Sequence, residues 1–381
     1  MKIAIICDVL GQANNGTTIA ALNLIRTLKA KGHEVRVVCP DQNRVGEPGF
    51  FVVPKYDFHM FNGYVEKNGV APAKLDPQVL EAAIHDVDVI HVMIPFALGK
   101  AAALYAHTHH IALTAGFHCQ AENITNHIFL QNAKKANTMV YHILYDRLYR
   151  WCDCIHYPTQ FIRDTFEGVV GPTPGRVISN GVSSDFHPIE VERPKELEGK
   201  FLVLFTGRYS REKSHRVLIE AVAKSRHRDS IQLIFAGAGP QEQNLRRLAK
   251  RLGILPPIMK FYGREELVRT VNLADLYVHP AEIEIEAISC LEAIACGRVP
   301  LIADSPRSAT RYFALTDRNL FHHGDPEDLA KKMDWWLEHP EEREKCSRDY
   351  LGYAHQFDFD ACMDAMERML LDAAESVRHG G

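Results

Sequence analysis

The most constraining feature of this sequence is an alternation of strand-like and helix-like segments that runs along the chain and starts afresh near its middle. Apolar, β-branched runs such as KIAIICDVL, EVRVVCP and DVDVIHVMIP are separated by stretches whose apolar side chains recur at helical spacing. After a charged, turn-rich segment, the alternation restarts with FLVLFTGRYSREK and continues to VPLIAD. This pattern predicts an α/β chain with two Rossmann-like, doubly wound parallel sheets. Chemistry is then expected beyond the carboxyl ends of the strands, in a central cleft that the two domains face.

The predicted domains span residues 1–187 and 188–357, followed by a terminal segment over 358–381. A chain of 381 residues suits two domains of ordinary size. The terminal segment contains FDFDACMDAMERMLLDAAESV, whose apolar residues fall on one stripe of a helix. We therefore expect one long amphipathic helix after the second domain.

Charge, hydropathy and cysteine content exclude several classes of protein. The 44 basic and 48 acidic side chains leave a net charge of −4, which argues against a nucleic-acid partner. No apolar run approaches the ~18 residues of a spanning helix, and the N-terminus resembles a buried strand more than a signal peptide. Nine scattered cysteines, with one CxC pair and no second pair, suggest reduced thiols in a core, and hence a cytoplasmic protein without a zinc site.

The loop GQANNGTT follows the first predicted strand and precedes a helix. Its glycines, Gly11 and Gly16, could bring backbone N–H groups against a phosphate, although a tight turn without a ligand explains them equally well. The loop is not a GxGxxG fingerprint, and no acidic residue follows at the spacing that a nicotinamide ribose needs. A Rossmann-type oxidoreductase is therefore disfavoured.

A second loop, FTGRYSREKS, carries two cations immediately after the first strand of the second domain. Arg208 and Lys213 lie beside Gly207, and an arginine fork with a mobile lysine suits a dianionic diphosphate. The alternative is a pair of solvated surface cations. Residues 201–260 hold 12 Lys and Arg against 4 Asp and Glu, so the positive charge is concentrated where these cations lie. In FAGAGPQEQN, Gly237 and Gly239 indicate either a second phosphate loop or a closely packed strand-to-helix turn.

The stretch HPAEIEIEAISCLEAIACGRVPLIAD carries two carboxylates eight residues apart. Glu284 is expected at a strand exit and Glu292 on the following helix, where a carboxylate can accept hydrogen bonds from sugar hydroxyls. The neighbouring Glu282 and Glu286 are expected to be exposed.

Together these motifs resemble the retaining GT-B glycosyltransferases of family 4, also described as glycosyl transferases group 1. The resemblance runs over nearly the whole chain. It rests on the Gly207-Arg208…Lys213 loop, the Glu284–Glu292 pair and LEAIACG, together with ISNGVSSDFHP, the N-terminal NNG, GFH at 116–118, YPT at 157–159 and the FDF near the end.

The resemblance implies transfer of a hexose from a nucleotide-diphosphate sugar, without a metal or other cofactor and with retention at the anomeric carbon. Arg208 and Lys213 would hold the diphosphate. Glu284 would contact the donor sugar, and Glu292 the ribose hydroxyls. Four further positions are implied at this site: His118 near the transferred sugar, and Gly16, Gly207 and Ile288 on the donor-binding surface. Arg264 would lie near the base, the donor is expected to be UDP-linked, and the C-terminal helix would cross back to the first domain.

One departure from the family bears on the donor site. The family commonly has Pro-Phe-Gly-Leu after its first glutamate, whereas this chain has Ile285-Glu286-Ala287-Ile288. Alanine lacks the conformational freedom of glycine, so the backbone at this point and the choice of sugar are in question. Two alternatives therefore stay open: a nucleotide-sugar epimerase of the same fold and a non-catalytic nucleotide-sugar-binding protein.

Asp86-Val87-Asp88 matches the DxD sequence that binds a metal in a different glycosyltransferase fold. Here it opens an apolar strand, and we interpret it as a solvated strand entrance.

The segment 120–151 is where the first domain would meet its acceptor, a sugar or a lipid. Its residues 132–151 combine basic side chains with Tyr141, Tyr145, Tyr149 and Trp151 around an apolar stripe. Such a helix can bind an anionic bilayer, which would bring the protein to the inner face of the membrane and favour a membrane glycolipid or lipid precursor as acceptor. The alternative is a helix that packs on the core of its own domain.

Overall fold

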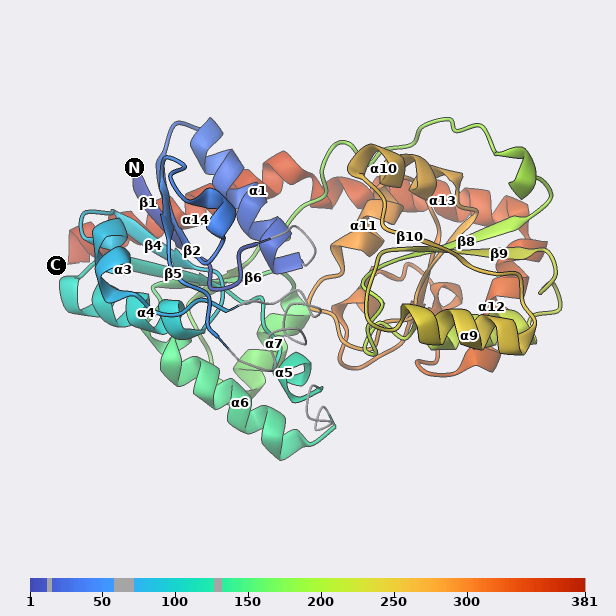
Figure 1. The fold of residues 1–381 in the computed structure, drawn as a ribbon, viewed down its shortest axis with the longest axis horizontal. Helices are drawn as coiled ribbons and strands as arrows, with labels where there is room; N and C mark the ends of the chain where they lie inside the picture. The colour runs from blue at the N-terminus through green and yellow to red at the C-terminus, as the bar shows by residue number, and fades with distance from the viewer. Residues whose placement is uncertain (12–15, 58–71, 127–131, 381) are drawn as a thin grey trace. The chain divides into compact units, whose positions relative to one another are not determined.

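The computed structural model describes residues 1–11, 16–57, 72–126 and 132–380 (Figure 1). The chain forms two compact units. Unit 1 comprises Met1–Asn180 together with Asp360–Gly381, and unit 2 comprises Gly181–Phe359. Each unit contains one parallel sheet covered by helices, so the expected α/β fold class is confirmed.

In the described part of unit 1, seven parallel strands form a sheet in the order β3-β2-β1-β4-β5-β6-β7. The strands are β1 (Lys2–Ile6), β2 (Glu34–Cys39), β3 (Phe50–Val52), β4 (Val89–Val92), β5 (Ala112–Gly116), β6 (Cys154–Tyr157) and β7 (Gly175–Val177). The helices are α1 (Gly16–Ala30), α3 (Pro77–Ile84), α4 (Ala97–His109), α5 (Ala121–Asn126), α6 (Lys134–Arg147), α7 (Gln160–Val170) and α14 (Phe359–Gly380).

The long helix α14 belongs to unit 1 although it follows unit 2 in the sequence. Its Met366, Met369 and Leu370 are buried. At its surface, Glu367 accepts from both Lys31 (2.6 Å) and His33 (2.7 Å) at the start of β2. Burial of the apolar stripe thus attaches α14 to the sheet, and surface ion pairs add little to that attachment.

In unit 2, six parallel strands form a sheet in the order β10-β9-β8-β11-β12-β13 over the described residues. The strands are β8 (Phe201–Thr206), β9 (Ile231–Ala236), β10 (Ile258–Lys260), β11 (Leu276–His279), β12 (Pro300–Ala303) and β13 (Leu320–Phe321). The helices are α8 (His215–Lys224), α9 (Glu242–Leu252), α10 (Arg264–Leu273), α11 (Ile288–Ala295), α12 (Pro326–Glu338) and α13 (Pro340–Ala354).

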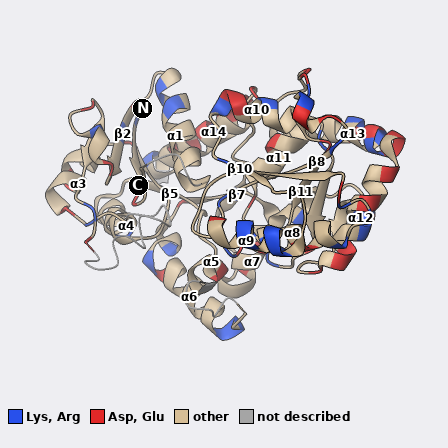
Figure 2. Cartoon of the chain, turned by 45° about the vertical axis from the view of Figure 1, so that its right-hand side comes forward, with Lys and Arg blue, Asp and Glu red and all other residues tan. Residues whose placement is uncertain are grey.

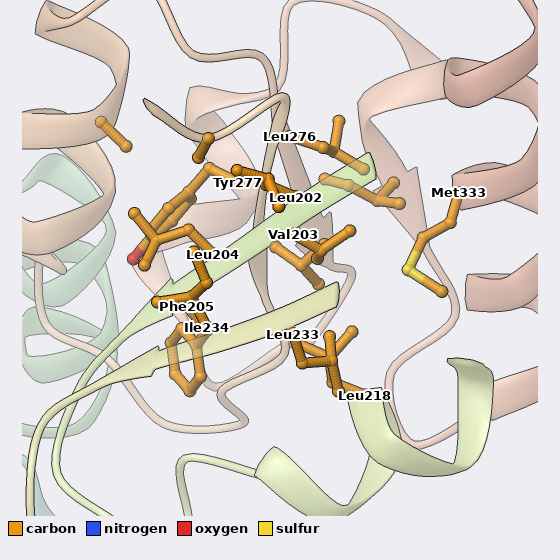
Figure 3. Packing of buried hydrophobic residues seen from close by; sticks show 14 of the residues in the cluster. Leu202, Val203, Leu204, Phe205, Leu218, Leu233, Ile234, Leu276, Tyr277 and Met333 are labelled. Carbon is orange, nitrogen blue, oxygen red and sulfur yellow. The ribbon is translucent and has the colours of Figure 1, made fainter. Parts of the chain in front are cut away.

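The core of unit 2 explains why its strands are continuous apolar runs. Leu202, Val203, Leu204 and Phe205 on β8 are all fully buried, because helices cover both faces of the sheet (Figure 3). On the helices outside this sheet, Lys and Arg gather on α8 and α9 (Figure 2). The central strands are therefore rigid supports for the loops at their carboxyl ends.

Among the described residues, no helix combines the length and apolar character needed to cross a bilayer. All nine cysteines are free thiols.

Candidate functional site

The strand order locates a candidate ligand site at one edge of each sheet. In unit 2 the order reverses between β8 and β11, and in unit 1 it reverses between β1 and β4. Ligands of doubly wound folds bind in the crevice outside the carboxyl ends of such strand pairs. The loops after β8 and β11 are the ones that carry Arg208, Lys213 and Glu284.

The loop after β8 is packed against the glycine-rich turn after β9. A Cβ on Gly237 would lie 2.1 Å from the carbonyl oxygen of Gly207, and one on Gly239 would lie 2.6 Å from the backbone nitrogen of Tyr209. Gly207 itself donates to the carbonyl of Ala236 (3.0 Å). The structure thus supports the closely packed turn as the role of Gly237 and Gly239.

Arg208 is held by a carboxylate that the sequence did not single out. Its guanidinium donates to Glu212 Oε1 (3.4 Å), and Ser210 Oγ donates to the same oxygen (2.5 Å). The backbone of Glu212 also accepts from the N–H of Glu282 (2.9 Å), which ties the loop after β8 to the loop after β11. Glu212 therefore orients the guanidinium and joins the two loops.

Lys213 and Glu284 form an ion pair that spans the same two loops. The ammonium group contacts Glu284 Oε1, and His279 Nε2 lies 3.2 Å from that oxygen. The Glu284 side chain is only 11% exposed. Burial works to raise the pKa of Glu284, but Lys213 and His279 outweigh it and lower this pKa to about 2. The carboxylate is thus fully ionised at neutral pH.

The backbone of Glu284 is fixed independently of its side chain. Its N–H donates to the carbonyl of Arg307 (3.4 Å), and its own carbonyl accepts from Ala309 (2.9 Å). A parallel bridge to Ser308 results, just beyond β12. The loop after β11 is therefore held from both sides, which keeps the ion pair in place.

Two residues next to this ion pair have left-handed backbone conformations. Ser214 has φ 53° and Ala287 has φ 62°, and each directly precedes a helix, α8 or α11. Such conformations cost ~1–2 kcal/mol for a non-glycine residue and concentrate at functional sites. Ala287 thus adopts, despite its Cβ, a conformation that glycine takes more readily.

The structure corrects the expectation for Glu286, which is buried with 4% exposure. Glu282, which was also expected to be exposed, is half-buried, and Arg307 donates to its Oε2 (3.0 Å). The burial of Glu286 depends on its neighbours in the folded chain, which a linear pattern does not reveal.

Helix α11 begins at Ile288, and Glu292 follows one turn later on the same helix. Burial raises the pKa of Glu292 to about 7, against a smaller opposing effect of Arg264. Arg264 begins α10, pairs with Asp185 (2.6 Å) and lies over the ring of Phe186. Glu292 can therefore act as a hydrogen-bond donor or acceptor near neutral pH.

In unit 1, His118 lies just beyond β5, and its ring occupies the space that a side chain on Gly116 would need. A Cβ on Gly116 would be 2.5 Å from His118 Nε2. The ring of His156 stands edge-on to it at 5.5 Å. Burial lowers the pKa of His118 well below its usual range, with smaller contributions from His156 and His91. His118 is therefore a neutral hydrogen-bonding group.

The first loop of unit 1 is described only in part. Gly16 is the exposed first residue of α1, and residues 12–15 lie outside the described residues. Asp8, at the start of the loop, is fully buried and accepts from the backbone N–H groups of Leu98 (3.0 Å) and Gly99 (3.2 Å) at the N-terminus of α4. The role of Asp8 is to cap a helix.

Helix α6 corrects part of the interpretation of the segment 132–151. Tyr141 and Tyr149 are buried against Phe117 and Phe166. Both tyrosines belong to the core and are withdrawn from the surface face. Of the segment 120–151, residues 127–131 lie outside the described residues.

The exposed face of α6 still carries an apolar and basic surface. Met139 is 64% exposed and Ile143 is 37% exposed, one helical turn apart. Lys134, Lys135 and Arg147 are also exposed on this helix.

The two carboxylates of the DxD sequence lie at the opposite, amino-terminal edge of the sheet. Asp86 pairs with Lys2 (2.5 Å) and Arg36 (2.5 Å), and Asp88 with Arg378 and with the backbone N–H of Lys2. Within the described ranges, no three His, Cys, Asp or Glu side chains gather in a way that could hold a metal ion.

Sequence reasoning missed Glu212 and His279. The only signal for His279 was the alternation in LYVH, which places Tyr277 and His279 on one face of β11. No spacing linked either residue to Arg208 or Glu284, because those contacts arise only when β8 and β11 lie side by side.

The two halves of the chain match two family models. Residues 14–186 match the model described as Glycosyltransferase Family 4, and residues 188–349 match the model described as Glycosyl transferases group 1. A GDP-mannose-dependent α-mannosyltransferase of Corynebacterium glutamicum is 27% identical over 79% of this chain and 72% of its own. An α-monoglucosyldiacylglycerol synthase of Streptococcus pneumoniae is 24% identical over 80% of this chain and 71% of its own.

Among solved structures, that of Anabaena HepE in complex with UDP and glucose is similar over 98% of this chain and 100% of its own. The TM-score is 0.76 and the sequence identity 18%.

The fold and the motifs define a GT-B glycosyltransferase. More particularly, the chain belongs to glycosyltransferase family 4, whose two models together match most of its length.

Proposed function

We propose that this glycosyltransferase transfers glucose or a related hexose from a UDP-linked donor to a hydroxyl group of a lipid acceptor, with retention and without a metal. The observation that carries the proposal is the ion pair of Lys213 with Glu284, which joins the loops after β8 and β11 at the switch point of unit 2. An anionic diphosphate and a sugar hydroxyl are the ligands that such a cation and carboxylate suit.

In this proposal, Arg208 and Lys213 bind the diphosphate and stabilise the charge that develops on it. Glu284 accepts a hydrogen bond from the donor sugar. Glu292 contacts the ribose hydroxyls, and Gly207, Ile288 and Arg264 contribute to the surface that holds the nucleotide.

Unit 1 supplies the remaining groups of the proposed reaction. His118, neutral and held over Gly116, hydrogen-bonds the sugar, and Gly16 approaches the diphosphate with its backbone. The acceptor oxygen attacks the anomeric carbon on the face from which the phosphate departs. The bond from that carbon to the phosphate oxygen breaks, and the acceptor proton passes to the departing phosphate.

The relatives leave two donors to be distinguished. The Corynebacterium relative is named for GDP-mannose, and the solved HepE structure holds UDP and glucose. A thermal-shift panel of UDP, GDP, UDP-glucose and GDP-mannose tests the choice, because a ligand that binds the native state raises its melting temperature. We expect UDP and UDP-glucose to give the larger shifts, and Arg208→Ala to abolish them.

Arg216→Ala is the matched control for that panel. Arg216 is a solvated cation on α8, with a side chain that is 71% exposed and pairs only with Glu220 among the described residues. Its removal should leave the shifts unchanged. No shift with any of the four nucleotides would contradict the proposed function, and larger shifts with the GDP pair would replace UDP by GDP.

A lipid acceptor is favoured by the surface of α6 together with the Streptococcus relative, which is named as a synthase of a glucosyldiacylglycerol. Met139 and Ile143 could enter a bilayer surface while the nearby lysines contact anionic headgroups. The enzyme would then work at the cytoplasmic face of the membrane.

Flotation with vesicles of phosphatidylglycerol and phosphatidylcholine tests this contact. The wild type should float at low salt, and the double variant Met139→Asp, Ile143→Asp should remain in the unbound fraction. The control is Leu104→Asp, which changes an exposed leucine (61%) on α4. Equal flotation of all three proteins would contradict a role of α6.

A further inference from the structure

A fully buried histidine, His279, contacts the carboxylate of Glu284 and has no role in the proposed reaction so far. It is the last residue of β11, with 0% exposure, and the ring of Phe205 stands edge-on to it at 5.3 Å. Its Nε2 lies 3.2 Å from Glu284 Oε1, and its Nδ1 lies 3.3 Å from the hydroxyl of Tyr277. Both ring nitrogens therefore have a polar partner.

The partners determine which nitrogen carries the proton. Burial lowers the pKa of His279, against an opposing effect of Glu284, so that the ring is neutral at physiological pH. A neutral imidazole has one N–H group and one lone pair. The carboxylate of Glu284 can only accept, which requires the proton on Nε2, and Nδ1 then accepts from the Tyr277 hydroxyl.

The hydroxyl of Tyr277 is held in turn by the start of α11. Its oxygen lies 3.3 Å from Ser289 Oγ, and Ser289 Oγ lies 3.2 Å from the carbonyl of Thr206 at the end of β8. Because the Tyr277 proton is donated to His279 Nδ1 in this arrangement, the single proton of Ser289 serves either the tyrosine oxygen or the carbonyl. Glu284 is thus connected through buried side chains to both strands of the switch point. Such support fixes the rotamer of a binding residue.

Both neighbours of Glu284 act on the same oxygen. Lys213 and His279 contact Oε1, whereas Oε2 accepts no hydrogen bond from the residues that the structure describes. When the diphosphate of a donor attracts Lys213, His279 remains as the group that holds Oε1. Oε2 is then presented to a sugar hydroxyl in a fixed orientation.

We propose that His279 is a positioning residue for the donor sugar, which acts by donating from Nε2 to Glu284 Oε1 so that Oε2 is aimed at a sugar hydroxyl. This inference rests on the proposed function, because it takes a nucleotide sugar as the ligand of Glu284. It predicts that His279 affects the binding of the sugar and leaves the binding of the nucleoside diphosphate unchanged.

Isothermal titration with UDP-glucose and UDP, and with GDP-mannose and GDP, measures the two contributions separately. His279→Leu removes the donor and should weaken binding of the nucleotide sugar about tenfold or more, while the affinity for the free diphosphate changes less than about twofold. His279→Gln supplies an amide N–H and should recover most of the loss. A loss that is equal for sugar and diphosphate, or absent for both, would overturn the proposal.

His215 offers a matched control within the same unit. It is also buried (1%) and contacts Phe205, but neither ring nitrogen has a hydrogen-bond partner among the described residues. His215→Leu should leave the ratio of sugar to diphosphate affinity as in the wild type. A ratio altered as much as in His279→Leu would indicate a packing effect and contradict the proposal.

A second readout needs no nucleotide. In protein labelled with ¹⁵N-histidine, the resonances of His279, assigned with His279→Gln, should show a neutral ring protonated at Nε2, and Glu284→Ala should mix the two tautomers. A ring protonated at Nδ1 in the wild type would overturn the inference. If no nucleotide bound while the expected tautomer was observed, the proposed function would fail and the support of Glu284 by His279 would stand.

Discussion

The loops that follow β1 in unit 1 and β8 in unit 2 occupy equivalent places in two sheets of the same kind, but they treat charge in opposite ways. In unit 2, Arg208 and Lys213 are each held by a carboxylate that an anionic ligand can replace. In unit 1, residues 8–17 contain no Lys or Arg, and the carboxylate of Asp8 is used up in capping α4. The same type of sheet therefore carries, in unit 2, a loop whose cations can leave their carboxylate partners for an anionic ligand. In unit 1 it carries a loop without such cations.

The largest expected effect is on turnover. Lys213→Ala should lower the release of nucleoside diphosphate from the preferred nucleotide sugar about 10²–10³-fold, because it removes a cation from the developing negative charge. His118→Ala in unit 1 removes only a neutral hydrogen-bonding group and should cost about tenfold. Steady-state kinetics of both variants compare the charged loop after β8 with the neutral group beyond β5 of unit 1, with Arg216→Ala as the control. A larger loss in His118→Ala would reverse the comparison.

The next effect concerns how tightly the glycines at the carboxyl ends of the strands are packed in each unit. Gly237→Ala and Gly239→Ala each force a Cβ against backbone atoms, so the free energy of unfolding of unit 2 should fall by about 3 kcal/mol. Gly116→Ala meets only the His118 ring, a side chain that can rotate, and should cost about 1 kcal/mol in unit 1. Urea unfolding measures both losses. An equal loss in all three variants would show that the end of β5 in unit 1 is packed just as tightly.

A smaller effect is expected in the pH dependence of stability. Burial raises the pKa of Glu292 to about 7 and that of Asp8 to about 6. A carboxyl group with a raised folded-state pKa stabilises the fold fully below its unfolded pKa, and this contribution is lost as the pH rises through the folded value. Glu292→Gln should therefore leave stability unchanged at pH 5 and increase it by about 1 kcal/mol at pH 8.

Asp8→Asn is the corresponding variant in unit 1, and its effect on stability should differ from that of Glu292→Gln in unit 2. It relieves the same burial of charge, but it also replaces one oxygen that accepts from the start of α4, so stability should fall by about 1 kcal/mol at pH 5 and by less at pH 8. Thermal melts between pH 5 and pH 8 follow both variants. A gain at pH 8 in Asp8→Asn would contradict the structural role of this carboxylate.

The smallest effect should come from the left-handed residues. Ala287→Gly relieves strain next to the Glu284 loop but increases the freedom of the unfolded chain, so a gain of about 0.5 kcal/mol remains. His110, which ends α4 in unit 1 with φ 53°, is the matched position in the other unit. Calorimetry of Ala287→Gly and His110→Gly compares the change in the free energy of unfolding at these two left-handed positions. Equal changes would mean that the strain at Ala287 is no greater than at His110. Greater stabilisation at 287 alone would indicate strain retained for function.

The sequence predicted the elements that depend on local pattern. The apolar runs correctly indicated β1, β4, β8 and β11, and with them the parallel sheets. The places of Arg208, Lys213 and Glu284 on loops after strands followed from the same pattern, because a parallel sheet gathers such loops at one edge. What these side chains do there remains a prediction.

The contacts between distant segments could not be predicted. Tyr141 and Tyr149 looked like part of a surface because their partner Phe166 follows many residues later. Glu286 is buried, and it precedes Ala287, whose left-handed backbone an alanine normally disfavours. The hydrogen-bonding role of His279 depends on Glu284, on the loop after β11, and on Tyr277, two residues earlier. In each case the burial or the contact of the side chain is set by residues that pack against it in the folded chain. The local periodicity of the sequence does not encode those residues.

The position of α14 has a consequence for the order in which the protein can fold during its synthesis. Unit 1 is built from both sides of unit 2, whereas unit 2 is one continuous stretch. As the ribosome moves along the message, unit 2 can complete its core while unit 1 still lacks the helix that contributes the buried Met366 and Leu370. Nascent chains with unit 1 translated but α14 still missing would thus expose apolar surface for the whole time that unit 2 is being made, and that interval is when a chaperone would be needed most.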